Sequence, residues 1–91
     1  GPGEIYAGGT TIAERAVERI GISVIIERAK EEDTKWTFYD SWNKFLENTD
    51  RVSSKKYLDV EGDYYYRVRC THSANDDMSS SFTNGVYIEE P

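Results

Sequence analysis

The segment from Leu58 to His72 constrains the fold more than any other part of the sequence, because a glycine-marked corner leads directly into a long alternating strand. Side chains of a β-strand point alternately to the two faces of a sheet. One face of this strand carries Tyr64, Tyr66, Val68, Cys70 and His72, and the other carries Tyr65, Arg67, Arg69 and Thr71. The split predicts a sheet with a core face and a solvent face.

Length and composition indicate one small domain with an aromatic core. Of the 91 residues, 37% are hydrophobic and 13% are aromatic, so large rings must supply much of the buried area. Gly1-Pro2 has the form of a protease-cleavage remnant from expression, and the predicted single domain therefore spans residues 3–91. The single cysteine, Cys70, excludes an intrachain disulfide and a four-cysteine zinc site.

The charge balance points away from two classes of partner. A net charge of −6 and a pI near 4.7 argue against binding to nucleic acid, which requires a cationic face, and against anionic membranes. No apolar run of ~18 residues or more is present, so we predict no membrane insertion. No charged-then-apolar leader precedes Glu4, and we therefore expect any secretory signal peptide to have been removed.

Short β-strand patterns fill most of the remaining chain, and Ser73–Ser81 is predicted as a loop from its composition. The predicted strands are Gly3–Thr11, with a bulge or bend at Gly8-Gly9, then Ile20–Arg28, Trp36–Phe45, Arg51–Val60 and Phe82–Glu89. About six to seven short antiparallel strands in one small domain are typical of a β-sandwich, with a small barrel as the alternative. The expected core consists of Ile22, Val24, Ile26, Trp36, Tyr66, Val68, Cys70, Val86 and Ile88.

Two segments do not fit a regular strand. Thr11–Glu14 has the form of a helix capping box, and apolar residues follow at helical spacing, which predicts a short helical turn near residues 12–19. The alternative is an irregular first strand. In Trp36–Phe45 the alternation fails because Asp40 shares a face with the aromatic residues, and this predicts a bulge or bend near Asp40-Ser41.

The stretch from Val60 to Cys70 resembles the corner and penultimate strand of fibronectin type III and related immunoglobulin-like (Ig-like) domains. The resemblance implies an all-β, Ig-like sandwich. It also implies that the hydroxyl of a corner tyrosine bonds to backbone a few residues upstream. Tyr66 occupies the matching position, and Tyr64 is the alternative.

A wider set of segments resembles a family of small, uncharacterised secreted proteins of Gram-positive bacteria. The matching segments are Ile20–Val24, Trp36–Trp42, Tyr64–Arg69, Thr71–Ala74 and Thr83–Ile88. This resemblance implies a secreted, extracellular location and carries no established activity. The chain departs from the family pattern at Cys70, where a small residue is commoner, and in the acidic turn Glu31–Asp33.

The sequence contains weak candidates for catalysis and metal binding. Cys70 and His72 share a strand face, but same-face neighbours are ~6.5–7 Å apart, which is a poor geometry for a thiol and its base. We therefore predict that the protein is not an enzyme and has no cofactor. Asn75–Asp77 supplies oxygen ligands that suit calcium, but three adjacent residues cannot all face one ion, so a solvated turn is the favoured interpretation.

The strongest candidate for function is an exposed cluster formed by Tyr65, Arg67, Arg69 and Tyr87. Rings beside guanidinium groups suit a protein partner or a stacked sugar, while cross-strand packing is the structural alternative. We predict a secreted, non-enzymatic module that binds a protein or a cell-surface glycan. The alternative is a structural domain that self-associates into a homo-oligomer through an exposed edge strand.

Overall fold

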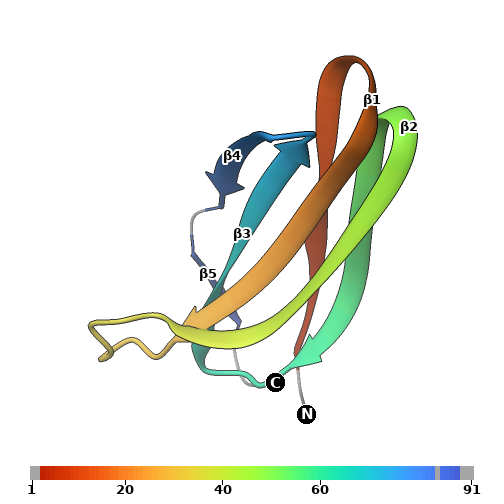
Figure 1. Cartoon of the computed structure of the whole chain (residues 1–91). Helices are drawn as coiled ribbons and strands as arrows, with labels where there is room; N and C mark the ends of the chain where they lie inside the picture. Colours follow the sequence, from red (N-terminus) through yellow and green to blue (C-terminus); the bar gives the residue numbers. More distant parts are fainter. Residues whose placement is uncertain (1–2, 84, 89–91) are drawn as a thin grey trace.

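The computed structural model describes residues 3–83 and 85–88 and shows one antiparallel sheet of five strands (Figure 1). The strands are β1 (Gly3–Ala29), β2 (Thr37–Val60), β3 (Tyr64–Ala74), β4 (Asp77–Phe82) and β5 (Val86–Ile88). The prediction of an all-β chain is confirmed, whereas the described residues form five strands, against the six to seven expected. Within the described residues, no helix has the length and apolar character needed to cross a membrane.

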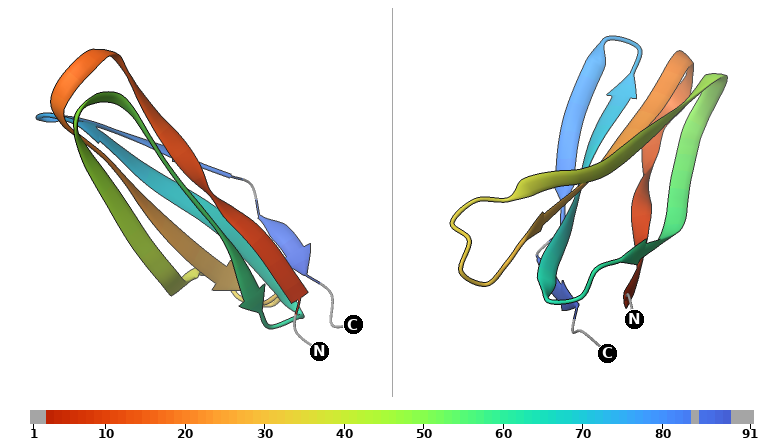
Figure 2. Two further views of the ribbon diagram at one scale, coloured as in Figure 1. Left: turned by 90° about the vertical axis from the view of Figure 1, so that its right-hand side faces the viewer. Right: turned by 90° about the horizontal axis from the view of Figure 1, so that it is seen from below.

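The two longest strands form one hairpin that folds back on itself (Figures 1 and 2). Ile12 of β1 pairs with Arg51 of β2, but the next pair joins Val17 to Thr49, so four residues of β1 lie opposite one residue of β2. These extra residues produce the bend. The helical turn predicted near residues 12–19 is therefore wrong: the segment is too short to hold a helix alone, and it forms an irregular part of β1, the alternative interpretation, in which Ile12, Val17 and Arg19 pair with β2.

The bend explains why fewer strands are present than the sequence indicates. Each long strand contains two of the predicted strands, and its halves lie in two facing layers (Figure 2). Hydrogen bonds tie the layers together: the Thr11 hydroxyl donates to the Gly21 carbonyl at 3.0 Å, and the Trp42 indole donates to the Ser54 hydroxyl at 3.0 Å. Side chains between the layers are shielded from water on both sides.

The core lies between these layers and is built mainly from the second half of β1. Its buried members are Ala7, Ile20, Ile22, Val24, Ile26, Val52, Val60, Tyr66 and Cys70. Val68 and Ile88, also predicted in the core, are half-buried and pack against this cluster. Two predictions are wrong: Val86 is 58% exposed because β5 is a short outer strand, and half-buried Trp36 precedes β2 and lies outside the cluster.

A second irregularity corrects the alternation in the aromatic segment. Ile26 pairs with Asp40 and Glu27 pairs with Phe38, which leaves Tyr39 as an extra residue in β2. The predicted bulge thus exists, one residue earlier than expected. Because of it, Trp42 shares the core side with Val24, while Phe38 is directed to solvent and is 66% exposed.

At Gly8-Gly9 the structure has no bulge, because the pairing of β1 with β2 continues without a shift from Gly3 to Ile12. The predicted loop Ser73–Ser81 is wrong: β3 continues to Ala74, a tight turn follows, and β4 pairs back onto β3. The predicted last strand is interrupted after Phe82. Its predicted end, Glu89, and the cleavage remnant Gly1-Pro2 lie outside the described residues.

Candidate functional site: an aromatic and arginine face

The strand β3 directs Tyr65, Arg67 and Arg69 to the face of the sheet that points away from the core. Tyr65 pairs across the sheet with Tyr87 of β5, and their ring centroids are 4.8 Å apart at an interplanar angle of 60°. Residues directly opposite in an antiparallel pair share a face. The structure therefore brings the four candidate residues together; we call this surface the outer face.

Arg67 is held from two sides on the outer face. Its Nε donates to the Glu27 carboxylate at 2.9 Å, and its guanidinium carbon lies 4.5 Å from the centroid of a Trp36 ring. Glu27 reaches this position because it pairs directly with Arg67 across β1 and β3. A charge-assisted hydrogen bond and a cation–π contact together fix the orientation of the guanidinium group.

Arg69 is held much less tightly. Its Nη2 lies 3.8 Å from the second oxygen of Glu27, and its side chain is 48% exposed. On its other side it pairs with Phe82 of β4, which is 76% exposed. Two guanidinium groups thus share one carboxylate among the described residues, which leaves Arg69 weakly paired beside an exposed ring.

Tyr87 is anchored through its hydroxyl, which donates to the Asp63 carboxylate at 3.3 Å. Partial burial, and then the nearby Asp63 charge, raise the pKa of Tyr87 above its ordinary value. The phenol therefore remains a hydrogen-bond donor to Asp63 over the physiological range, and this contact orients its ring against Tyr65. The ring surfaces, rather than the hydroxyl, are the part of Tyr87 that a ligand could contact.

The sequence did not indicate three residues of the outer face: Glu27, Trp36 and Phe82. Glu27 could have been found, because alternation in Ile20–Arg28 places it on the face opposite the buried isoleucines. Trp36 was expected in the core, yet it covers Arg67 and closely approaches Gly85. Phe82 depends on the register of β4 with β3, and no local pattern specifies that register.

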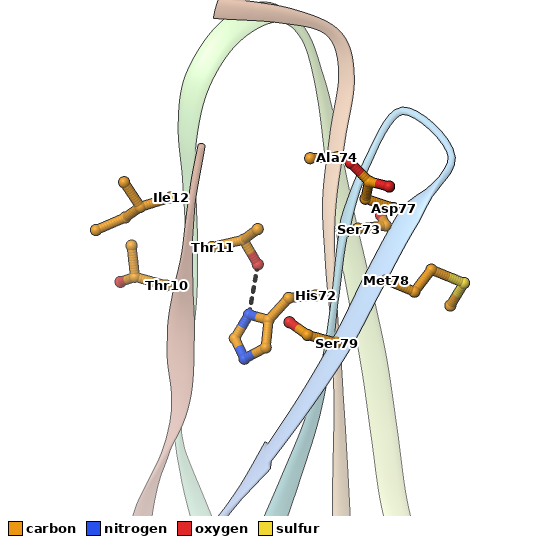
Figure 3. Close-up of a pocket in the computed structure, with 9 residues that line it drawn as sticks. All are labelled: Thr10, Thr11, Ile12, His72, Ser73, Ala74, Asp77, Met78 and Ser79. Carbon is orange, nitrogen blue, oxygen red and sulfur yellow. Dashed lines mark hydrogen bonds between the residues drawn. The ribbon is translucent and has the colours of Figure 1, made fainter. Parts of the chain in front are cut away.

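The second candidate, the thiol and imidazole of Cys70 and His72, does not form a pair. His72 Nδ1 lies 2.7 Å from the Thr11 hydroxyl (Figure 3), and its Nε2 lies 2.8 Å from the Ser81 hydroxyl. Cys70 is buried, and desolvation raises the pKa of its thiol. A buried protonated thiol without a base is a poor nucleophile.

The hydrogen bonds of His72 also fix its tautomer. The Thr11 hydroxyl donates its only proton to the Gly21 carbonyl, so His72 Nδ1 must donate to Thr11. Nε2 of the neutral ring then accepts from Ser81. A serine hydroxyl that faces Nε2 resembles the serine–histidine pair of a catalytic triad. The group bonded to Nδ1 is, however, the neutral hydroxyl of Thr11, which cannot stabilise an imidazolium as a carboxylate does.

The loop considered for calcium has a structural role in the hairpin between β3 and β4. The amide oxygen of Asn75 accepts from the Arg19 backbone at 3.1 Å, and the Asn75 backbone donates to the Arg19 carbonyl at 2.8 Å. These contacts occupy the oxygen that calcium would need. Within the described ranges, no group of three histidine, cysteine, aspartate or glutamate side chains is arranged to hold a metal ion.

Comparison of the chain with protein-family models, with curated proteins and with solved structures gives no match. Assignment of a function therefore depends on the geometry and chemistry of the surfaces described above. The outer face combines the exposed ring of Phe82 and the half-exposed Arg69 with the Arg67–Trp36 contact on one side of the sheet.

Proposed function

We propose that the protein is a secreted, non-enzymatic binding module of Ig-like type that contacts a protein or a cell-surface glycan through its outer face. The observation that carries the proposal is the sharing of Glu27 by Arg67 and Arg69 on an exposed, ring-lined surface. The extracellular location and the Ig-like type depend on the sequence resemblances. The Ig-like type is supported by the corner hydrogen bond of Tyr66 and by the two-layered sheet.

The chemistry of the outer face favours a ligand with a negatively charged group. Arg69 is half-exposed and only weakly paired, so its guanidinium group can accept a carboxylate or sulfate at little cost in existing contacts. Phe82 lies opposite Arg69; Tyr65 lies nearer the start of β3, and Tyr87 lies beside it on β5. These rings provide apolar surface on which the body of a sugar or an aromatic side chain can stack.

The experiment is binding of the purified protein to a glycan array that contains matched neutral and acidic sugars. We expect binding to acidic glycans that is lost in Arg69→Ala and in the double variant Tyr65→Ala/Arg67→Ala, and that is retained in Cys70→Ser. Binding that survives the double change but fails in Cys70→Ser, in a protein shown by circular dichroism to be folded, would overturn the proposal. So would equal binding of neutral and acidic sugars.

The self-associating alternative is supported by one observation, which is that residues 3–12 of β1 pair only with β2 among the described residues. An exposed edge of this kind can pair with another chain. The net charge of −6 opposes it, because two copies repel each other. Light scattering over a range of concentrations separates the two functions: the binding module is expected to be monomeric, and the self-associating domain is not.

A further inference from the structure

The first half of β1 has an unpaired edge. Gly3–Ile12 pairs with β2 on one side, and β3 pairs with β1 only from Ile20 onward. The free backbone donors and acceptors of a strand edge are a template on which a further strand can form. About ten residues of β1 are therefore available within the described part of the chain.

Three cavities lie in a row beside this edge, between β1 and the C-terminal strands β4 and β5. The lowest cavity lies at the Glu4 end of the edge and the highest at the Ile12 end. The lowest is about 300 Å³ and is bounded by Ile5, Val68, Val86 and Ile88 among others. The middle and upper cavities are about 380 Å³ each. Adjacent cavities share wall residues: the lower two share Val68 and Thr83, and the upper two share Thr10 and His72. They therefore form one continuous groove.

The groove has a structured floor and one closed end. Its floor is the inner face of β3, where Tyr66, Val68, Cys70 and His72 alternate along the strand. In the upper part, His72 extends across the floor towards Thr11 (Figure 3) and also bonds to Ser81, so the imidazole ties β1, β3 and β4 together. At the lower end, the Ile88 side chain packs closely against Gly3 and closes the groove.

The charges that line the groove all have the same sign. Glu4 lies in the wall of the lowest cavity and Asp77 in the wall of the highest, and none of the described lysines and arginines lines any of the three. Both carboxylate side chains belong to exposed residues. A segment that enters the groove is therefore attracted if it is cationic and repelled if it is anionic, as a second copy of this acidic chain would be.

We propose that this groove binds an extended, basic peptide segment, which pairs with the free edge of β1 and directs alternate apolar side chains onto the floor formed by β3. Backbone hydrogen bonds to β1 would supply affinity that does not depend on sequence. The cavities would select apolar side chains at every second position, because side chains of an added strand alternate between floor and solvent. A segment of about eight residues, at ~3.3 Å per residue, would span the distance from Glu4 to Ile12.

The probe is a synthetic peptide of about eight alternating lysine and valine residues, titrated into ¹⁵N-labelled protein and followed by NMR. We expect amide shifts concentrated in residues 4–12 and in the residues of β3 that form the floor. A glutamate–valine peptide of the same length should not bind, and neither should the lysine–valine peptide with its backbone nitrogens methylated at alternate positions. The double variant Glu4→Lys/Asp77→Lys should weaken binding by about tenfold or more.

A matched pair of substitutions tests the location of the site. Val86→Arg introduces a cation into the lowest cavity, whereas Phe38→Arg introduces one at a similarly exposed apolar residue outside the groove. We expect the first to abolish peptide binding and the second to leave it unchanged. Shifts outside the groove, equal binding of the methylated peptide or insensitivity to Val86→Arg would overturn the proposal. A dimer that protects the amides of residues 3–12 without peptide would also overturn it.

The result does not depend on the function proposed for the outer face. Arg69 lies on the opposite side of β3 from the groove floor, so Arg69→Ala should leave peptide binding intact. Loss of acidic-glycan binding in Arg69→Ala with retained peptide binding would show that the two surfaces act separately. Failure of the peptide experiment alone would overturn only the groove.

Discussion

The hydroxyl of Tyr66 donates a 2.7 Å hydrogen bond to the backbone carbonyl of Glu61, at a sequence separation of five. The bond joins the buried start of β3 to the turn that precedes it, and Tyr66 is only 2% exposed. Its ring also meets Tyr39 edge-on at 5.6 Å. This tyrosine thus fixes the angle at which the chain passes from β2 into β3, as expected from its position after the glycine-marked corner.

Replacing Tyr66 with phenylalanine should remove this hydrogen bond while leaving the ring in the core. We expect the free energy of unfolding to fall by about 0.5–1.5 kcal/mol, the net contribution of one hydrogen bond. Tyr65→Phe is the matched control and should have almost no effect, because Tyr65 contributes through its ring contact with Tyr87 on the outer face. Urea titrations of the three proteins make the comparison. A larger loss in Tyr65→Phe than in Tyr66→Phe would contradict the assignment.

The faces of individual strands could be predicted because they depend on a local property. Alternation alone placed Ile22, Val24 and Ile26 inside, and it placed Tyr66 and Arg67 on opposite faces of β3. The failure of the alternation in Trp36–Phe45 also predicted the bulge, which lies at Tyr39, to within one residue. Such predictions succeed because a one-residue slip would expose an entire apolar face.

The bend and the C-terminal pairing could not be predicted because they depend on distant partners. Residues 12–19 have helical spacing, yet Ile12, Val17 and Arg19 pair with residues 47–51 of β2, and this pairing determines the conformation of the segment. The segment Asp77–Phe82, which contains three serines, forms β4 because its backbone pairs with β3, although its side chains are all exposed. The register of β4 then placed Phe82 beside Arg69 and Ser81 beside His72.

Two isoleucines of β1 test the assignment of the core. Ile22 is fully buried between the layers, while Ile12 is 63% exposed near the bend. Ile22→Ala should lower the free energy of unfolding by about 2–5 kcal/mol, through lost transfer energy and the cavity that remains. Ile12→Ala should change it by less than about 0.5 kcal/mol. Chemical denaturation measures both; similar losses for the two variants would mean that the layers are incorrectly placed.

Two adjacent threonines of β1 test the tie between the layers. The Thr11 hydroxyl is buried and serves both the Gly21 carbonyl and His72, whereas the Thr10 hydroxyl makes an exposed bond to Ser53 at 2.7 Å. Thr11→Val keeps the shape but leaves two polar groups without a partner, so we expect a loss of about 1–3 kcal/mol. Thr10→Val should lose less than about 0.5 kcal/mol. Thermal unfolding of both variants distinguishes the residues, and equal effects would exclude a specific role for the Thr11 network.

The buried thiol of Cys70 predicts a particular dependence of stability on pH. Burial raises the pKa of Cys70 above its usual value of 9.0, so the native protein retains this proton at pH values where the unfolded chain has released it. The native state then binds more protons than the unfolded state. Stability due to this group is therefore complete below pH 9.0 and falls as the pH rises towards the native pKa.

Comparison of the wild type with Cys70→Ala isolates this effect from the tyrosines, which also titrate at high pH. The variant has a lower stability at neutral pH because a small cavity forms, but its stability should decrease less steeply above pH 9.0. One proton limits the difference in slope to about 1.4 kcal/mol per pH unit. Urea titrations at closely spaced pH values from 7 to 10.5, roughly the range over which thiols and phenols titrate, measure the two slopes. Parallel curves would show that the Cys70 thiol is accessible to water, and the core between β1 and β3 would then need to be reassigned.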